Sequence, residues 1–327
     1  FHYGGIVRSA EIAFLGDLRI RELRAHYTLE GRNVRLAPEI ILENLSRREI
    51  RDELLLELDG VEIARIPVLL PPGVTTSIRR EFPPKALSLW SPDAPALHTL
   101  RAQCAGDDLA DRTGFRSLAA RNGRILLNGK PLKLLGVNRH DEYGDCGWAV
   151  PLDMLRRDFQ LIRDLGCNAV RCHYPITALG MDLCDEMGFL VWSEIPFYAR
   201  WPKVVGRTDY LALAEQALES MIGRDYNRPS IFLWSVQNES ATNIPEGARA
   251  AARLVRKVRA LDPTRPIGYA SNHGVADKGL RSVDVIGINS YPGWYDEARF
   301  TPWSEMLSKL RAKLDRMGKP GAPILIT

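Results

Sequence analysis

Apolar and polar residues follow two different rhythms along the chain, and the change falls near Arg112. Between residues 21 and 112, apolar residues take every second position in short runs such as "ELLLELDG", "EIARIPVLL" and "HTLRAQC". Gly, Pro, Asn and Asp separate these runs at intervals of about ten residues, a pattern that predicts an antiparallel β-sandwich. Residues 1–20 contain a glycine turn and one alternating strand, which is too short to fold alone.

From residue 113 to residue 327, strands alternate with helices. A hairpin and a first buried strand fall within 124–140, and six more strands are predicted at 168–175, 189–196, 231–240, 266–272, 283–294 and 323–327. Apolar residues at helical spacing predict helices at 151–166, 176–188, about 209–226, 245–263 and 303–318. This alternation predicts a parallel sheet with right-handed crossovers. Seven strands favour a (β/α)₈ TIM barrel, incomplete at its carboxyl end, over a dinucleotide-binding sheet, because no G-x-G-x-x-G follows the first strand.

The stretch from Ile231 to Ser240, "IFLWSVQNES", carries the strongest chemical signal. Its first four residues are apolar, as in a strand buried on both faces, and it ends on Asn238 and Glu239. The carboxyl ends of barrel strands form the active face of barrel enzymes. A carboxyl group with apolar neighbours can keep its proton near neutral pH there and act as a general acid. The competing interpretation is that Glu239 caps the next helix or forms a surface ion pair.

Amides, carboxylates, histidines and aromatic rings gather at the predicted strand ends. They are Asn138, Arg139, His140, Asp141, Arg171, His173, Tyr174, Glu194, Asn238, Glu239, Asn289, Tyr291 and Trp294. This mixture suits a polyhydroxylated ligand, because polar groups bind hydroxyls and aromatic rings cover the C–H faces of a sugar. Phosphate chemistry would need a glycine-rich nest, which the sequence lacks. The two histidines could instead be hydrogen-bonded core residues, and Trp234 and Cys172 are expected to pack in the core.

Composition restricts the class of protein without identifying its function. The 327 residues are 45 % hydrophobic and 26 % charged, as in an ordinary soluble globular protein. The net charge of +4 comes from scattered arginines, and no nucleic-acid-binding motif accompanies it. The five cysteines show no C-x-x-C spacing and are predicted to be reduced, which favours the cytoplasm over a secreted location. No apolar run approaches the ~18 residues of a membrane span, and because the chain opens with Phe1 a signal peptide would lie outside it.

Eight segments resemble glycoside hydrolase family 2, the group of β-galactosidases, β-glucuronidases and β-mannosidases. They are "GGIVR", "LWSPDAPALHTL", "GFR", "LNGKPLKLLGVNRH", "NAVRCHYP", "LCDEMGFLVWSEIP", "RDYNRPSIFLWSVQNES" and "INSYPGWY". They keep the family's order and cover most of the chain. The resemblance implies the end of a jelly-roll sugar-binding-like domain at 1–20, an immunoglobulin-like β-sandwich at 21–112, and a TIM barrel at 113–327 that is cut in its seventh strand.

The resemblance also implies roles for residues at the strand ends. Glu239 matches the acid/base of the family, and Asn238 matches the amide that binds the sugar 2-hydroxyl. His173, in "HYP", matches a sugar contact, and Arg171 matches the barrel arginine near the nucleophile. The further substrate-binding candidates are His140, Asn289, Tyr291, Trp294 and Tyr295, of which Tyr291 matches the tyrosine that hydrogen-bonds the nucleophile.

The nucleophile itself is expected as a glutamate directly after Thr327. Glu194, the only other strand-end glutamate in this chain, is not expected to replace it, because the family places no nucleophile there. "HDEYGDCG" departs from the "HED" or "HEH" of many members, so neither a metal nor another cofactor is predicted.

Two classes of function follow. The first is a retaining exo-β-glycosidase, in which Glu239 protonates the glycosidic oxygen, a second carboxylate attacks, and Glu239 then activates water. "WSVQNES" and "SVDVIGINSYPGWY" stand nearer the β-glucuronidase than the β-galactosidase branch, and β-galactosidase stays the alternative. The second class is a non-catalytic carbohydrate-binding fragment, since the 327 residues alone are expected to be inactive without a nucleophile. A β-linked carbohydrate is the expected partner, nucleic acid and membrane are not, and the full-length protein is a candidate homo-oligomer.

Overall fold

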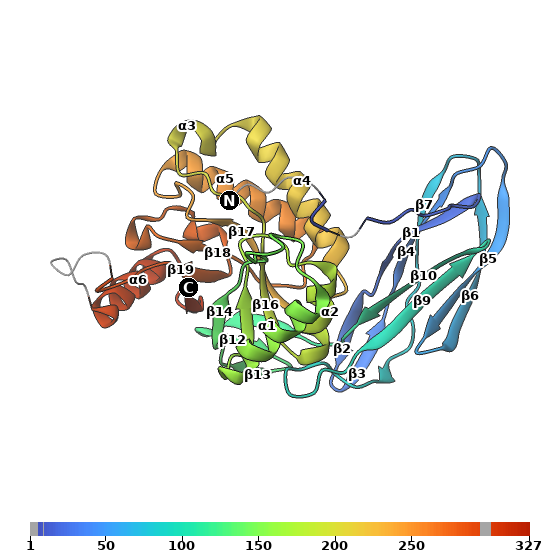
Figure 1. Cartoon of the computed structure of the whole chain (residues 1–327), viewed down its shortest axis with the longest axis horizontal. Helices are drawn as coiled ribbons and strands as arrows, with labels where there is room; N and C mark the ends of the chain where they lie inside the picture. Colours follow the sequence, from blue (N-terminus) through green and yellow to red (C-terminus); the bar gives the residue numbers. More distant parts are fainter. Residues whose placement is uncertain (1–5, 9, 295–301) are drawn as a thin grey trace.

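The computed structural model describes residues 6–8, 10–294 and 302–327. Figure 1 shows two parts side by side, a group of antiparallel strands (blue to cyan) and a parallel sheet surrounded by helices (green to red). The antiparallel part ends with β10 (Asp107–Thr113), which agrees with the change of rhythm near Arg112. The two patterns of apolar spacing therefore correspond to two different architectures.

Within the described residues, ten strands build the antiparallel part. They are β1 (Leu18–Arg24), β2 (Tyr27–Glu30), β3 (Asn33–Leu36), β4 (Glu39–Asn44), β5 (Ile50–Leu58), β6 (Val61–Leu70), β7 (Thr75–Arg79), β8 (Lys85–Ala86), β9 (His98–Cys104) and β10. They pair into sheets of order β1-β4-β7, β10-β9-β5-β6 and β2-β3-β8. Alternate side chains point inward, so that Ile40, Leu42, Leu54 and Leu56 are completely buried in one shared core.

The strand predicted within residues 1–20 is wrong for the part of it that the structure describes. Residues 6–8 and 10–16 form no strand, and the side chains of Ile12 and Phe14 are 87 % and 97 % exposed. The first strand instead begins at Leu18, where it pairs antiparallel with β4. An alternating pattern becomes a strand only where a neighbouring strand accepts its backbone hydrogen bonds.

Seven parallel strands form the sheet of the second part, and all seven were predicted in this order. They are β14 (Gly136–Asn138), β15 (Ala169–Arg171), β16 (Leu190–Glu194), β17 (Ile231–Asn238), β18 (Ile267–Ser271), β19 (Val285–Ile288) and β20 (Ile324–Ile326), neighbours in sequence being neighbours in the sheet. A small antiparallel sheet, β11 (Leu118–Arg121), β12 (Arg124–Leu127) and β13 (Lys130–Leu132), precedes them and contains the predicted hairpin. Between the two edge strands, β14 and β20, lies a cavity of about 390 Å³.

Helices connect the parallel strands and lie around the sheet in Figure 1. They are α1 (Leu152–Asp164), α2 (Ala178–Met187), α3 (Pro202–Val205), α4 (Thr208–Asp225), α5 (Pro245–Leu261) and α6 (Trp303–Arg316), with two 3₁₀ turns, Gly274–Ala276 and Gly279–Ser282, between β18 and β19. The five predicted helices are confirmed as α1, α2, α4, α5 and α6. Each crossover returns the chain to the same end of the sheet, so the carboxyl ends of all the strands face one way.

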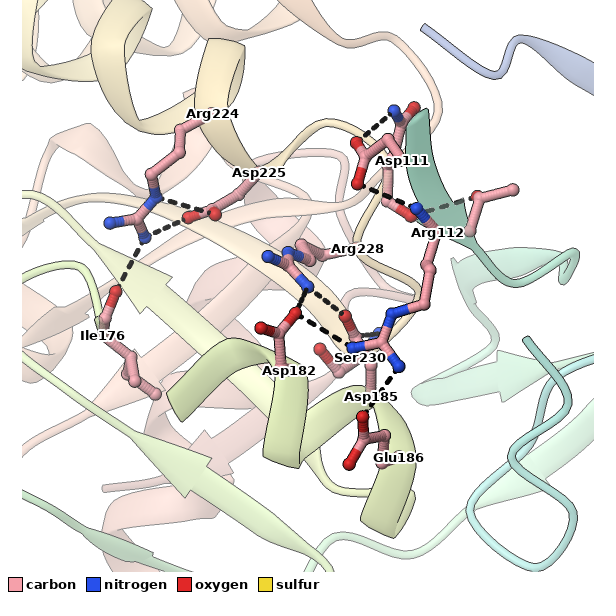
Figure 2. Close-up of polar contacts among 12 residues, drawn as sticks. Asp111, Arg112, Ile176, Asp182, Asp185, Glu186, Arg224, Asp225, Arg228 and Ser230 are labelled. Atoms are coloured by element: carbon pink, nitrogen blue, oxygen red, sulfur yellow. Dashed lines mark hydrogen bonds and ion pairs between the residues drawn. The ribbon is translucent and has the colours of Figure 1, made fainter. Parts of the chain in front are cut away.

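Ion pairs join the antiparallel part to the parallel part. Figure 2 shows Arg112, at the end of β10, reaching α2, where its guanidinium pairs with Asp182 at 3.2 Å and with Glu186 at 2.7 Å. Arg228, just before β17, pairs with Asp182 and, at 3.1 Å, with Asp185. The two pairs of Arg112 therefore fix β10 against α2, whereas the pairs of Arg228 lie within the parallel part and hold Asp182 in place.

The motif from Gly114 to Arg116 closes the same junction. Arg116 is buried and donates from Nε to the carbonyl of Pro229 at 2.6 Å and from Nη2 to the carbonyl of Ile231 at 2.7 Å. A Cβ on Gly114 would lie only 2.7 Å from the Cβ of Trp90, so the close approach requires glycine. The segment after the antiparallel sheets is thereby tied to the first residue of β17.

Trp234 and Cys172 lie in the core, as predicted. Trp234 is completely buried, and its Nε1 donates to Asp262 Oδ2 at 2.7 Å. Cys172 is also buried, and all five cysteines are free, which confirms the prediction of unpaired thiols. Across the described ranges, every helix is too short or too polar to cross a membrane.

Candidate active site

The site begins where β17 ends. Every residue of this strand up to Gln237 is buried, as its apolar sequence predicts, and Asn238 and Glu239 emerge only partly exposed. Glu239 has a φ of 47°, in the left-handed region that residues other than glycine rarely adopt. Its backbone N–H donates to the carbonyl of Ala270 in β18 at 2.9 Å, which anchors the turn to the neighbouring strand.

Asn289, at the end of β19, contacts both residues of the Asn238–Glu239 pair. Its Nδ2 donates to Glu239 Oε1 at 2.7 Å and to Asn238 Oδ1 at 3.1 Å. Its Oδ1 accepts a hydrogen bond from Thr327 Oγ1 at 2.5 Å. The sequence predicted Asn289 as a sugar ligand, but in this structure its amide is engaged by protein groups and orients the acidic side chain beside it.

A buried ion pair lies beneath these residues. Arg171, from β15, and Glu194, from β16, are 6 % and 0 % exposed, with Arg171 Nη2 3.1 Å from Glu194 Oε2. The same Nη2 donates to Asn238 Oδ1 at 2.9 Å, and the guanidinium lies 5.1 Å from the ring centroid of Trp192. Because Asn238 Oδ1 already accepts bonds from Arg171 and Asn289, the Nδ2 group of Asn238 is the part of that amide left to bind a ligand.

Glu194 has three further hydrogen-bond partners and no exposed surface. Trp192 Nε1 donates at 3.2 Å, Ser235 Oγ at 2.6 Å, and His173 Nδ1 lies 2.9 Å from Oε1. A carboxylate only accepts hydrogen bonds, so Nδ1 of His173 carries the proton and Nε2 is the nitrogen available to a ligand. A carboxylate this enclosed cannot reach a sugar carbon, which agrees with the sequence-based rejection of Glu194 as nucleophile.

His140 stands at the rim, after β14. Its Nδ1 shares a hydrogen bond of 3.1 Å with the hydroxyl of Tyr174, and its ring centroid lies 5.5 Å from that of His173. Partial burial lowers the pKa of His140, and the neighbouring His173 lowers it further. Tyr174 also accepts a bond from the backbone N–H of Asp141 at 3.2 Å, so it positions the loop that carries His140.

A pocket of about 340 Å³ opens over this arrangement. It is lined by His173, Tyr174, Glu194, Ile195, Pro196, Phe197, Tyr198, Asn238 and Glu239. The segment 195–198 was not predicted as part of the site. It directly follows the strand "FLVWSE", and this position at a strand end could have identified it. A larger cavity, about 660 Å³, lies between the antiparallel and parallel parts among His26, Arg116 and Arg265, but the predicted site residues do not line it. The chemistry therefore assigns the site to the smaller pocket.

Two of the three predicted aromatic residues after β19, Tyr291 and Trp294, do not line this pocket. Tyr291 and Trp294 are 46 % and 79 % exposed, and neither lines the pocket beside Glu239. The N–H of Trp294 donates to the carbonyl of Tyr291 at 3.0 Å, closing a tight turn. Tyr295 lies outside the described residues. Their role in binding a sugar stays a prediction.

The arrangement offers a partly exposed carboxyl group, an amide, an imidazole and an arginine within one concave site. Glu239 can give or take a proton, Asn238 and His173 can bind hydroxyls, and Arg171 supplies fixed positive charge. Among the residues that the structure describes, no group of three or more His, Cys, Asp or Glu side chains could hold a metal ion.

Comparison with protein families gives a match over the parallel part of the chain. Residues 118–327 match the family described as "Glycosyl hydrolases family 2, TIM barrel domain". The chain is 30 % identical over 314 residues to human β-glucuronidase, covering 91 % of this chain and 46 % of that protein. It is 36 % identical over 187 residues to mouse β-glucuronidase, covering 56 % of this chain and 29 % of that protein.

Two solved structures extend the likeness to the antiparallel part. A family 2 β-galacturonidase from Eisenbergiella tayi, bound to galacturonate, superposes with a TM-score of 0.90 at 30 % identity over 96 % of this chain and 57 % of its own. A β-glucuronidase from Bacteroides uniformis gives a TM-score of 0.81 at 26 % identity over 94 % of this chain and 40 % of its own. The chain thus spans about half the length of the relatives that it covers best.

Proposed function

The chain belongs to glycoside hydrolase family 2, with the family's TIM barrel domain at residues 118–327, and from this premise we propose that the whole protein is a retaining exo-β-glycosidase acting on terminal β-hexuronides. The observation that carries the proposal is the Asn238–Glu239 pair. It stands at the carboxyl end of β17, beside a pocket, and is held by Asn289 and Arg171. A surface cap or surface ion pair would not need these buried supports.

Glu239 acts as the acid/base in this mechanism. In the first step it protonates the glycosidic oxygen while a carboxylate attacks the anomeric carbon, forming a covalent glycosyl-enzyme and releasing the alcohol. In the second step Glu239, now ionised, takes a proton from water as the water oxygen bonds to the anomeric carbon, and the bond to the nucleophile breaks, which gives net retention. Asn238 presents Nδ2 to the sugar 2-hydroxyl and His173 presents Nε2 to another hydroxyl, so both strengthen binding at the reacting ring.

The nucleophile is proposed to be a glutamate that directly follows Thr327, one residue beyond the end of β20. Retention requires the two carboxyl groups to be about 5–5.5 Å apart. Thr327, just after β20, donates to Asn289, which in turn donates to Glu239, so Thr327 and the acid/base are already within two hydrogen bonds of each other. Tyr291 and Arg171 are proposed to contact the nucleophile, as in the family.

The proposed substrate class is a β-hexuronide, with β-glucuronide as the first candidate. The curated relatives at 30–36 % identity are β-glucuronidases. A β-galacturonide is the second candidate, because the solved structure with a TM-score of 0.90 is a β-galacturonidase. Both substrates carry a carboxylate at C6 and differ in the orientation of one hydroxyl. A neutral β-galactoside stays the alternative within the same family.

The domain boundaries are proposed from the same relationship. The predicted bounds were 1–20 for the end of a jelly-roll domain, 21–112 for an immunoglobulin-like sandwich and 113–327 for the barrel. Because β1 begins at Leu18 and pairs with β4, we propose that the sandwich begins there and keep the other bounds. The shared core between the sheets β1-β4-β7 and β10-β9-β5-β6 supports a sandwich.

Matched substrates test the proposal. The full-length protein is given 4-nitrophenyl β-glucuronide, β-galacturonide, β-glucoside and β-galactoside, and kcat/KM is measured for each. A site that pairs with a carboxylate leaves buried donors unpaired when C6 is a hydroxymethyl group, so the preferred uronide should exceed its neutral partner by roughly 10⁴. Preference for the β-galactoside would reject the uronide assignment and keep the glycosidase. Absence of turnover on all four would favour a non-catalytic carbohydrate-binding protein.

A further inference from the structure

We propose that Gln237 is a positioning residue, which holds the backbone of Glu239 in the conformation needed for proton transfer. The inference rests on the proposed role of Glu239 as acid/base. Gln237 is the residue two positions before Glu239, at the buried end of β17, and only 1 % of it is exposed. It does not line the pocket and is not placed to touch a sugar.

The conformation of Glu239 is unfavourable by itself. Its φ of 47° belongs to the left-handed region, where the Cβ of an ordinary residue crowds the following carbonyl. Such residues persist where the surrounding structure determines the conformation, and they concentrate at functional sites. Something in the turn must therefore hold the chain in this shape.

The backbone hydrogen bonds of the turn identify that support. The N–H groups of residues 238, 239, 241 and 242 donate to backbone carbonyls, those of Phe197, Ala270, Ala199 and Ser240. The N–H of Ser240 instead donates to a side chain, Gln237 Oε1, at 2.6 Å. This bond closes a ring around Glu239, because it joins the residue two before it to the residue one after it.

The amide nitrogen of Gln237 is in an unfavourable environment. Among the described residues, the buried Nε2 of Gln237 has no hydrogen-bond partner. An unpaired buried N–H is unfavourable, so a hydrocarbon side chain of similar size would suit this position better if packing were its only role. A glutamine here is explained by what its oxygen does.

The turn around Glu239 also bonds to the segment 197–199, part of which lines the pocket. Ser240 Oγ accepts a bond from the N–H of Ala199 at 2.9 Å, and Phe197, two residues earlier, lines the pocket. If the Gln237–Ser240 bond is lost, Glu239 can relax to a right-handed conformation and move away from Asn289, which now lies 2.7 Å from its carboxylate. Displacement of a catalytic group by about 1 Å can cost roughly 10²-fold in rate.

Two substitutions of Gln237 in the full-length enzyme test the proposal. Gln237→Leu removes the acceptor oxygen at similar size, and Gln237→Asn keeps the amide but shortens it by one methylene. Gln237→Glu keeps an oxygen at the same distance and serves as the rescue variant. Val236→Ala is the control, because Val236 is equally buried on the same strand and carries no polar group.

The readout is kcat/KM on two hexuronides, one with a phenyl and one with a dinitrophenyl leaving group. Only the phenol, a poor leaving group, needs a proton from Glu239. We expect Leu and Asn at position 237 to lower kcat/KM about 10²-fold on the phenyl substrate and by less than about threefold on the dinitrophenyl substrate. Gln237→Glu should keep the wild-type ratio between the two substrates, and Val236→Ala should change both rates by the same factor.

Equal losses on both substrates would overturn the proposal, as would a Gln237→Glu variant that loses activity on the phenyl substrate alone. Failure of both the Leu and the Asn variant to fold would assign the amide to stability and would overturn it as well. Glu239→Gln is measured in parallel. If Glu239→Gln shows no dependence on the leaving group, the proposed function has failed, and the positioning role of Gln237 fails with it.

Discussion

At the scale of single residues, a fully buried carboxylate, that of Glu194, supports the candidate site from beneath. Glu194 neutralises the buried guanidinium of Arg171 and orients the imidazole of His173, while both of these partners face the site. Its charge is thus needed to keep in place two residues that we propose to bind substrate. A buried ion pair of this kind is costly to break from one side, because the remaining charge has no water to solvate it.

Glu194→Gln should therefore destabilise the protein and weaken catalysis together. The amide has nearly the same shape but leaves Arg171 uncompensated, and it can turn an N–H group toward His173. We expect the free energy of unfolding in urea to fall by about 3–5 kcal/mol and kcat/KM to fall with it. Glu215→Gln is the matched control, since Glu215 pairs with Arg253 on the outside of α4 and α5, and its loss should cost less than about 1 kcal/mol. Equal losses in the two variants would contradict this account of Glu194.

The residue types of the site were predictable, but their hydrogen-bond partners were not. The ends of strands identified Arg171, His173, Asn238 and Glu239, which the structure brings together. Asn289 was predicted only as a sugar ligand. Its contact with the carboxylate of Glu239, at 2.7 Å, could not be predicted, because it joins residues 50 positions apart in the sequence. Gln237 gave no signal, since its role depends on a turn conformation that only the structure reveals.

At the scale of elements, buried strands and amphipathic helices were easier to predict than charged strands. "IFLWSVQN" became β17 because a run of apolar residues has no other stable location than between two layers. β1, with the sequence "LRIRELR", was missed, because its outward positions carry arginine and glutamate and only its inward side is apolar. The predicted strand at 283–294 is real only from Val285 to Ile288, where the neighbouring strand β18 provides partners.

The end of α2 gives a prediction at this scale. Gly188 caps that helix with a φ of 74°, and a Cβ there would lie 2.3 Å from the carbonyl oxygen of Pro92. Gly318, just after α6, has a similar φ of 75° but has nothing within 4 Å of an added Cβ. Gly318→Ala should cost about 1–2 kcal/mol in urea unfolding, from the left-handed conformation alone. Gly188→Ala should cost about 1–3 kcal/mol more, because the backbone at Pro92 must move. Equal losses of unfolding free energy in the two variants would mean that the backbone at Pro92 moves without a measurable cost, contrary to this prediction.

At the scale of the whole molecule, two arginines hold the antiparallel part against the parallel part, the buried Arg116 and the partly exposed Arg112. Neither the contacts of Arg116 with the start of β17 nor those of Arg112 with α2 could be predicted, because they join segments about 70 to 115 residues apart in the sequence. The order of the seven parallel strands could be predicted, because right-handed crossovers leave little choice of neighbour. The strand order thus follows from the alternation of strands and helices in the sequence. The packing of the antiparallel part on the parallel part instead depends on contacts between distant segments.

The pH dependence of global stability tests a buried charge inside the parallel part, that of Asp262. Burial opposes the ionisation of Asp262, but the charge of Arg265 and hydrogen bonds from Thr264 and Trp234 outweigh it and lower the pKa of the folded carboxyl below the ordinary 3.8. The pair therefore contributes stability above about pH 4 and loses it as the pH falls toward the folded pKa. The advantage of the wild type over Asp262→Asn in urea unfolding should shrink between pH 5 and pH 3, by about 1 kcal/mol at pH 3. Parallel curves for the two proteins would contradict this role of Asp262.

Glu239→Gln in the full-length enzyme tests whether Glu239 supplies and removes the proton. The variant is assayed on an aryl β-hexuronide with a poor leaving group and on one with a good leaving group, next to the wild type. We predict that turnover of the poor substrate is abolished while the first, glycosyl-transferring step on the good substrate survives, because only the poor leaving group needs protonation. Unchanged rates on both substrates would contradict the assignment of Glu239 as the acid/base.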